Sequence, residues 1–174
     1  MCDFGPPHDG LHTRYSSRPL PPYRFVPGEG PHPTRDPEGH SHGERPPASE
    51  PWRPEEWHEL EEWLWAVDLF NDGYWWESHE ALEALWHAAG RTTSPARFAQ
   101  SLVHLSAACL NRRRGHEEAA RRQAARAVRG LRAARAMGPV VMGLNVEALA
   151  ADVLRAFSEN GGSPPRLELD VAGL

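Results

Sequence analysis

The sequence contains no lysine and no isoleucine, so arginine supplies all 19 of its basic side chains. The codons of both missing residues are rich in A and T, so their absence indicates a GC-rich genome and not a functional choice. Basic residues are also outnumbered, because 24 acidic side chains bring the formal net charge to −5. Dedicated nucleic-acid-binding proteins normally carry a basic surface. The charge balance therefore argues against nucleic acid as a partner.

Cysteine and long apolar runs are scarce as well. The two cysteines, Cys2 and Cys109, cannot form a disulfide framework or a zinc site of the Cys-x-x-Cys kind. No apolar stretch approaches the roughly 18 residues that a membrane-spanning helix requires. The first residues lack the basic and apolar regions of a signal peptide. We therefore expect a cytoplasmic protein without a membrane partner.

Proline, in contrast, is abundant at one end of the chain. Residues 1–54 hold 13 of the 17 prolines and five of the ten histidines. Proline fixes φ and lacks an amide donor, so this segment cannot form helices or interior strands. We expect its apolar side chains near Phe25 to dock it on the rest of the chain. The expected organisation is a disordered N-terminus, a Pro/His-rich arm and linker, a helical domain and a C-terminal tail, at residues 1–19, 20–53, 54–160 and 161–174.

Beyond residue 54 the pattern is helical, because apolar side chains recur at spacings of three and four. Glycine, proline and asparagine punctuate this pattern. The predicted helices cover residues 54–71, 74–89, 94–113, 116–136 and 146–157. The tail alternates from Leu167 to Val171 like a short strand, but no other strand is evident to pair with it. The predicted fold class is all-α, a compact bundle of four to five helices with an extended N-terminal arm.

The second expected helix carries polar residues on an apolar side. His79, Leu82, Glu83 and Trp86 lie three or four residues apart and share one side of the helix. Since Leu82 and Trp86 are apolar, we expect this side to be buried. A histidine and a carboxylate on a buried side need partners, because an unpaired buried charge is costly.

The third expected helix offers such partners. Gln100, His104 and Asn111 are spaced four and then seven residues apart, so they form one line along it. Antiparallel packing of the second and third helices would bring this line beside the polar side of the second helix. The expected result is a polar pocket lined by His79, Glu83, Gln100 and His104.

Three interpretations of this group of residues are open. It can be a buried hydrogen-bond network in which Glu83 holds the His79 ring. It can bind a divalent metal ion of unknown identity, for which the candidate ligands are His79, Glu83, His104, His32 and His40. It can transfer protons without a metal, for which the candidate catalytic residues are His79, Glu80 and Glu83. The candidate substrate-binding residues are Gln100, His104, Asn111 and Tyr74.

The same residues resemble a family of bacterial and archaeal proteins, the domain of unknown function 309. Its hallmark is similar to Phe-Asn-x-Gly-x-Tyr-Trp-Glu-x-His-Glu-x-x-Glu-x-x-Trp, which corresponds to the segment from Phe70 to Trp86. The next helix of the family resembles Gln-Gly-Leu-Ile-Gln-x-Ala-Ala, from which this chain departs at Ser101 and His104. The resemblance covers roughly residues 20–135. It implies a compact helical bundle and brings no established activity with it.

Two functional hypotheses follow. The first is a metal-assisted or acid–base hydrolase with its site at His79 and Glu83 and with Glu80 as the candidate base. The second is a non-catalytic protein-interaction module in which the same residues form a structural network. Acidic residues dominate the first two helices, whereas residues 112–135 are rich in arginine. Together with the seven tryptophans, this separation of charge predicts a homodimer.

Overall fold

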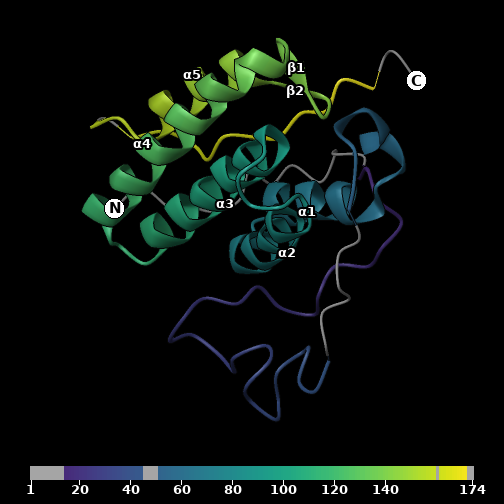
Figure 1. Cartoon of the computed structure of the whole chain (residues 1–174). Coiled ribbons are helices and arrows are strands. Elements are labelled where there is room, and N and C mark those ends of the chain that lie inside the picture. The colour runs from purple at the N-terminus through teal and green to yellow at the C-terminus, as the bar shows by residue number, and fades with distance from the viewer. Residues whose placement is uncertain (1–13, 45–50, 160, 172–174) are drawn as a thin grey trace.

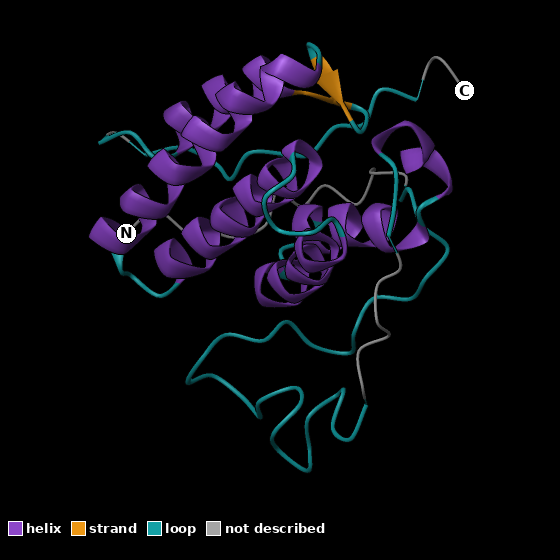
Figure 2. Ribbon diagram, in the orientation of Figure 1, coloured by secondary structure: helices purple, strands orange, loops and turns teal. Residues whose placement is uncertain are grey.

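The computed structural model describes residues 14–44, 51–159 and 161–171, and it confirms the predicted helical bundle with an extended arm (Figures 1 and 2). Five α-helices, two short 3-10 helices and one small hairpin make up the described fold. Their order is η1 (Pro54–Glu59), α1 (Glu61–Asn71), α2 (Trp75–Ala88), α3 (Ser94–Arg113), α4 (Glu117–Ala134), η2 (Arg135–Met137), β1 (Val140–Val141), β2 (Leu144–Asn145) and α5 (Val146–Ala156).

Helix α3 is the central element of the bundle. It packs against α2 on one side and α4 on the other, and α5 packs against α4 (Figure 1). The N-terminus of α3 is capped by Thr93, whose side chain accepts a hydrogen bond from the Ala96 amide at 3.2 Å. Gly130 brings α4 close to α3, because a Cβ atom at this position would lie 2.6 Å from the Ser101 Cβ. The bundle interior is apolar and includes Phe70, Leu82, Leu102, Leu105 and Leu131.

The first predicted helix differs from the observed one. Residues 54–71 do not form one continuous helix, because Leu60 adopts φ −83° and ψ 86°, which separates the 3-10 turn η1 from α1. Trp57 of η1 packs against Gly143, where a Cβ atom would lie 2.9 Å from the indole ring. The apolar spacing of this segment correctly predicted that Val67 and Phe70 are buried, but Trp57, Leu60 and Leu64 are only half-buried, and the break was not predicted.

The hairpin before α5 was not expected from the sequence. β1 and β2 pair antiparallel, with Val140 opposite Asn145. Met142 and Gly143 both have positive φ, 48° and 79°, as a two-residue turn between twisted strands requires. The predicted cap of the last helix is confirmed, because the Asn145 side chain accepts the Ala148 amide at 3.0 Å.

The C-terminal tail lies against the bundle without forming a strand among its described residues. Leu167 and Leu169 are buried, whereas Glu168 and Asp170 are exposed, so the predicted alternation is present. A side chain replaces the missing strand partner. The Asn71 amide donates to the Leu167 carbonyl at 3.0 Å and accepts from the Leu167 amide at 2.8 Å.

The expectation of a disordered N-terminus concerns residues 1–19, of which residues 1–13 lie outside the described ones. The following residues are held by α1. The buried Asp68 accepts the backbone amides of Tyr15 and Ser16 at 2.9 and 2.8 Å, and Glu61 accepts that of Ser17 at 3.0 Å. In the described parts of the chain, every helix is too short or too polar to cross a membrane.

Candidate functional site

Helix α2 presents two polar sides that point in different directions. Successive helical residues are rotated by about 100°, so Glu77 lies about 160° around the helix from His79 and about 120° from Glu83, and Glu80 lies between Glu77 and Glu83. Between these sides runs the buried stripe of Ser78, Leu82 and Leu85, which faces the bundle. We call His79, Glu80 and Glu83 the His79 cluster, and the side of the helix that carries Glu77 the Glu77 side.

The three side chains of the His79 cluster lie close enough together to share a metal ion. One ligand atom from each of its three side chains, a ring nitrogen and two carboxylate oxygens, lies within 4.8 Å of the others. The sequence predicted that this side of the helix is buried, and the structure corrects this expectation. His79 and Glu83 are half-buried and Glu80 is exposed, because the helix packs on α3 through the stripe beside them. The cluster therefore lies at the surface, open to ions and small molecules.

The imidazole of His79 is oriented by α3. Its Nδ1 lies 3.3 Å from the carbonyl oxygen of Val103. A carbonyl oxygen can only accept, so this contact places the proton on Nδ1 and leaves the lone pair on Nε2. Metal-binding histidines commonly donate their second nitrogen to a backbone carbonyl in this way.

The two carboxylates of the cluster have few structural partners. Glu83 has a long contact with His87, at 4.0 Å between Oε1 and Nε2. Glu80 has no hydrogen bond or ion pair with any other residue in the described ranges. Although the Glu80 side chain is exposed overall, partial burial of its carboxyl group raises its pKa, and the neighbouring Glu83 adds to the shift. His79 and His32 in their protonated forms, and the Arg35 guanidinium, oppose this increase in the pKa.

His104 lies beside the cluster on α3 but is not part of the three-residue group. Its ring is half-buried, and burial lowers its pKa below the ordinary value. A hydrogen bond with the Gln123 side chain opposes this shift, whereas the charges of Arg126, His79 and Arg129 enlarge it. Gln100 is half-buried one helical turn away along α3. Asn111 lies about 10 Å farther along α3 than His104 and donates to the Ala107 carbonyl at 2.7 Å.

The Glu77 side holds the N-terminal arm. Oε1 of the buried Glu77 accepts the Phe25 amide at 2.8 Å and lies 3.2 Å from Nε2 of His40. Both side chains of this Glu77–His40 pair are almost completely buried, with 3% and 5% exposed. Oε2 of Glu77 is buried as well and has no hydrogen-bond partner in the described residues. Burial raises the pKa of Glu77, and the hydrogen bonds from Phe25 and His40 oppose this shift.

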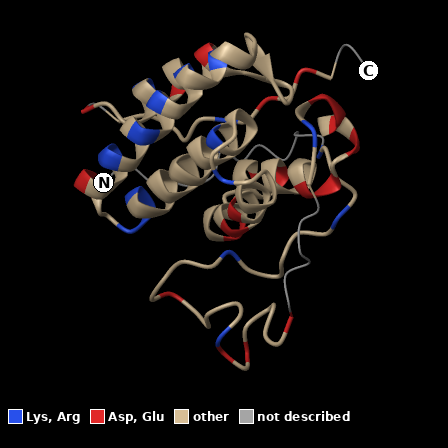
Figure 3. Cartoon of the chain, viewed as in Figure 1, with Lys and Arg blue, Asp and Glu red and all other residues tan. Residues whose placement is uncertain are grey.

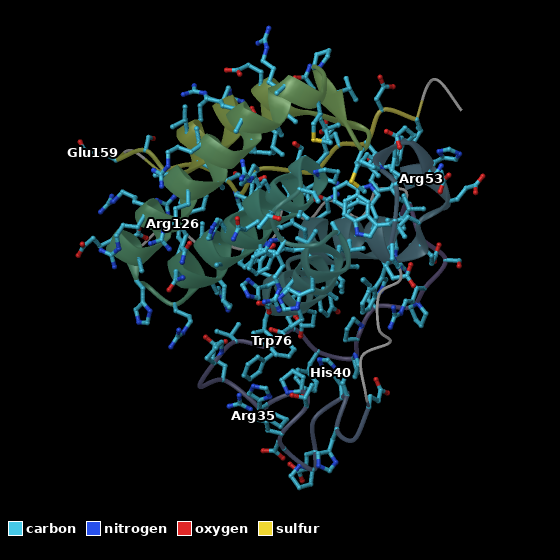
Figure 4. All side chains as sticks on the ribbon, viewed as in Figure 1. Arg35, His40, Arg53, Trp76, Arg126 and Glu159 are labelled. Carbon is cyan, nitrogen blue, oxygen red and sulfur yellow. The ribbon has the colours of Figure 1, made fainter. Side chains whose placement is uncertain are left out.

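The arm forms a loop beside α2, and in Figure 4 His40 and Arg35 of the arm lie below Trp76 of the helix. The Tyr23 hydroxyl donates to the Pro31 carbonyl at 2.9 Å and accepts the His40 amide at 3.2 Å. The rings of Phe25 and His32 pack against Trp76, with centroids 5.2 and 5.4 Å away. His40 therefore contacts Glu77, and His32 packs edge-on against Trp76, so neither of these candidate metal ligands is part of the three-residue group.

Tyr74, which was expected to bind substrate, also lies on the arm side. It immediately precedes α2, and the Arg24 guanidinium lies over its ring at 5.1 Å. Burial raises the pKa of Tyr74, while Arg24 opposes the shift. Arg24 also donates to the Asp72 carbonyl at 2.7 Å, which fastens the arm at the start of α2.

Sequence reasoning missed the roles of Glu77 and Asp68. Both are buried carboxylates that accept backbone amides of the N-terminal segment. Two features of the sequence could have indicated the role of Glu77. It lies in the segment that resembles the family hallmark, and the arm around Phe25 was expected to dock on the rest of the chain. Asp68 interrupts the buried apolar stripe of α1, and a buried acid in such a stripe requires a donor.

The fold and the site together define a helical bundle with a surface His/Glu cluster on its second α-helix. Residues 63–123, from α1 into α4, match the family model described as domain of unknown function (DUF309), which confirms the resemblance to that family. No curated protein and no solved structure matches the chain.

Proposed function

We propose that the His79 cluster binds one divalent metal ion and that the bound ion makes the protein a metal-assisted hydrolase. A single observation supports this proposal most strongly. Three potential ligand atoms lie within 4.8 Å of one another, and the histidine among them has its Nδ1 against a backbone carbonyl. This arrangement leaves Nε2 available to an ion without a change of tautomer.

The donor set suits a borderline metal such as zinc or manganese. Imidazole nitrogen and carboxylate oxygen both bind these ions, and few protein ligands leave coordination positions for water and substrate. In this scheme His79 and Glu83 hold the ion, which would lower the pKa of a bound water. Glu80 is close enough to accept the proton of that water. Its raised pKa makes it a stronger base than an ordinary glutamate.

The test is a calorimetric titration of the full chain with Zn²⁺ and with Mn²⁺. We expect one ion per chain, and we expect His79→Gln and Glu83→Gln to weaken its affinity by about 10–100-fold or more. The matched control is His116→Gln, which changes an exposed histidine at the start of α4 and leaves binding unchanged. Circular dichroism checks that each variant folds. Equal affinity in all four proteins excludes a metal site at the cluster. If the two cluster variants bind more weakly as expected, the metal-loaded protein is the one to screen for hydrolysis.

The alternative is a non-catalytic interaction module. It is favoured by the observation that the most buried carboxylate of α2, Glu77, has a structural role in holding the arm. If the His79 cluster is structural too, then His79→Gln will lower the free energy of unfolding without any change in metal affinity. The homodimer stays a prediction under both hypotheses, and analytical ultracentrifugation tests it.

A further inference from the structure

Helix α4 carries arginines without acidic partners next to the His79 cluster. Figure 3 shows basic residues following α4, and Figure 4 labels Arg126 among them. Some of these arginines form ion pairs, such as Arg122 with Glu118 and Arg132 with Glu147. Arg126 and Arg129 are exposed and have no ion pair to any other part of the chain that the structure describes. Their charges are therefore available to a ligand.

The packing of α3 and α4 places Arg126 near the cluster. These helices are joined by a short turn and run antiparallel, and Gly130 lies against Ser101. One turn back along α4 is Arg126, and one turn forward along α3 is His104, so these two residues lie side by side. On the other flank of α3, His79 contacts the carbonyl of Val103, the residue before His104. His104 thus separates the His79 cluster from Arg126, and the charges of both His79 and Arg126 act on its ring.

The charges of this region identify the kind of ligand that fits. A divalent ion on His79 and Glu83, with Glu80 beside it, is balanced by the two carboxylates. The positive charges of Arg126 and Arg129 are complementary to a ligand with about two negative charges. A phosphate monoester carries this charge at neutral pH. Guanidinium groups bind phosphate oxygens through paired hydrogen bonds, and divalent ions bind the same oxygens.

We propose that the ligand of this site is a phosphate monoester, whose phosphate group is bound by Arg126 beside the metal ion. The inference deepens the proposed function and rests on it for the position of the ion. Arg126 binds the phosphate, Arg129 adds positive charge, and Gln100 and His104 line the surface between α2 and α4 with polar groups.

The test uses the full chain loaded with Mn²⁺ and inorganic phosphate as the probe. Arg126→Gln should weaken phosphate binding by about tenfold or more, since hydrogen bonds to charged groups contribute most to such affinities. The matched control is Arg121→Gln, an exposed arginine of α4 roughly 140° around the helix from Arg126. It should leave the phosphate affinity within about twofold of that of the unchanged protein. Both variants should bind Mn²⁺ as the unchanged protein does.

The outcomes separate this inference from the proposed function. Equal phosphate affinity in the unchanged protein and the Arg126→Gln variant overturns the inference, even where Mn²⁺ binds as proposed. Tighter binding of acetate than of phosphate also overturns it, because it assigns the arginines to a carboxylate. If Mn²⁺ does not bind, then the proposed function fails. In that case the anion site is still supported if the unchanged protein binds phosphate and Arg126→Gln does not. If the unchanged protein does not bind phosphate, the anion site is excluded.

Discussion

The two polar sides of helix α2 use the same residue types for different purposes. Glu77 is buried, accepts a backbone amide and a histidine from the arm, and has almost no contact with water. Glu80 and Glu83, about one and two turns farther along the helix, are at the surface and have no comparable hydrogen bonds in the described residues. A histidine accompanies the carboxylates on each side, His40 from the arm and His79 from the helix itself.

Glu77 and the His79 cluster are therefore expected to have different roles, although both lie on α2. A buried carboxylate that is hydrogen-bonded by backbone contributes to stability, because its removal leaves donors without partners. Carboxylates that converge on a histidine at the surface repel one another and gain nothing from folding. The proposed metal ion would balance this repulsion. Changes on the two sides of α2 should therefore affect different measurements.

The largest effect on stability is expected for Glu77→Ala. The substitution leaves the Phe25 amide and the His40 ring without their acceptor, which costs about 1–3 kcal/mol in the free energy of unfolding. The arm should also become more accessible to proteases. Urea denaturation and limited proteolysis measure these two changes. Unchanged stability with a protected arm contradicts the role assigned to Glu77.

A substitution within the arm tests the contribution of the arm without changing any residue of α2. A Cβ atom at Gly39 would overlap the backbone carbonyl oxygens of His32 and Pro33, so Gly39→Ala must open the turn of the arm. We expect faster hydrogen exchange of the Phe25 amide and a loss of about 1–3 kcal/mol. The affinity for Zn²⁺ should stay unchanged, because the proposed ligands all belong to α2. A parallel loss of metal affinity would show that the two sides depend on each other.

The pH dependence of stability should come from the Glu77 side. Burial raises the pKa of Glu77 above its ordinary value of 4.5, so the folded protein binds this proton more tightly than the unfolded chain. The resulting stabilisation is fully present below pH 4.5 and is lost as the pH rises through the raised pKa. Glu77→Gln should remove this component. The check is the difference in unfolding free energy between the two proteins across pH 4 to 8, and a constant difference contradicts the prediction.

The smallest effect on stability is expected for Glu80→Ala. Glu80 has no ion pair or hydrogen bond in the described residues and lies beside Glu83, so its removal should change the free energy of unfolding by less than about 0.5 kcal/mol. The same substitution should abolish any metal-dependent hydrolysis. Urea denaturation is the measurement, and a loss comparable to that of Glu77→Ala would make the cluster structural.

The helices were predictable because the sequence marks them locally. Apolar spacing, the cap at Asn145 and the glycines between helices give their number and most of their boundaries. The break at Leu60 and the hairpin around Gly143 were not predictable, since Trp57 of one contacts the other across the fold. Contacts between residues that are distant in sequence leave no periodic signal.

The site was predictable in part for the same reason. His79, Glu80 and Glu83 lie on one helix, so their spacing alone brings them together. Their exposure was not predictable, because it depends on how far α2 is rotated against α3. The partner of His40 was not predictable either, since 37 residues separate it from Glu77 along the chain.

The central claim, a metal ion at the His79 cluster, is tested most directly by crystals of the full chain grown with Zn²⁺. Anomalous diffraction at the zinc edge locates the ion without assumptions about activity. The account predicts one strong peak within about 2.0–2.2 Å of His79 Nε2 and of a Glu83 carboxylate oxygen. An empty cluster, with zinc bound at Glu77 and His40 or only at exposed histidines elsewhere, would contradict it.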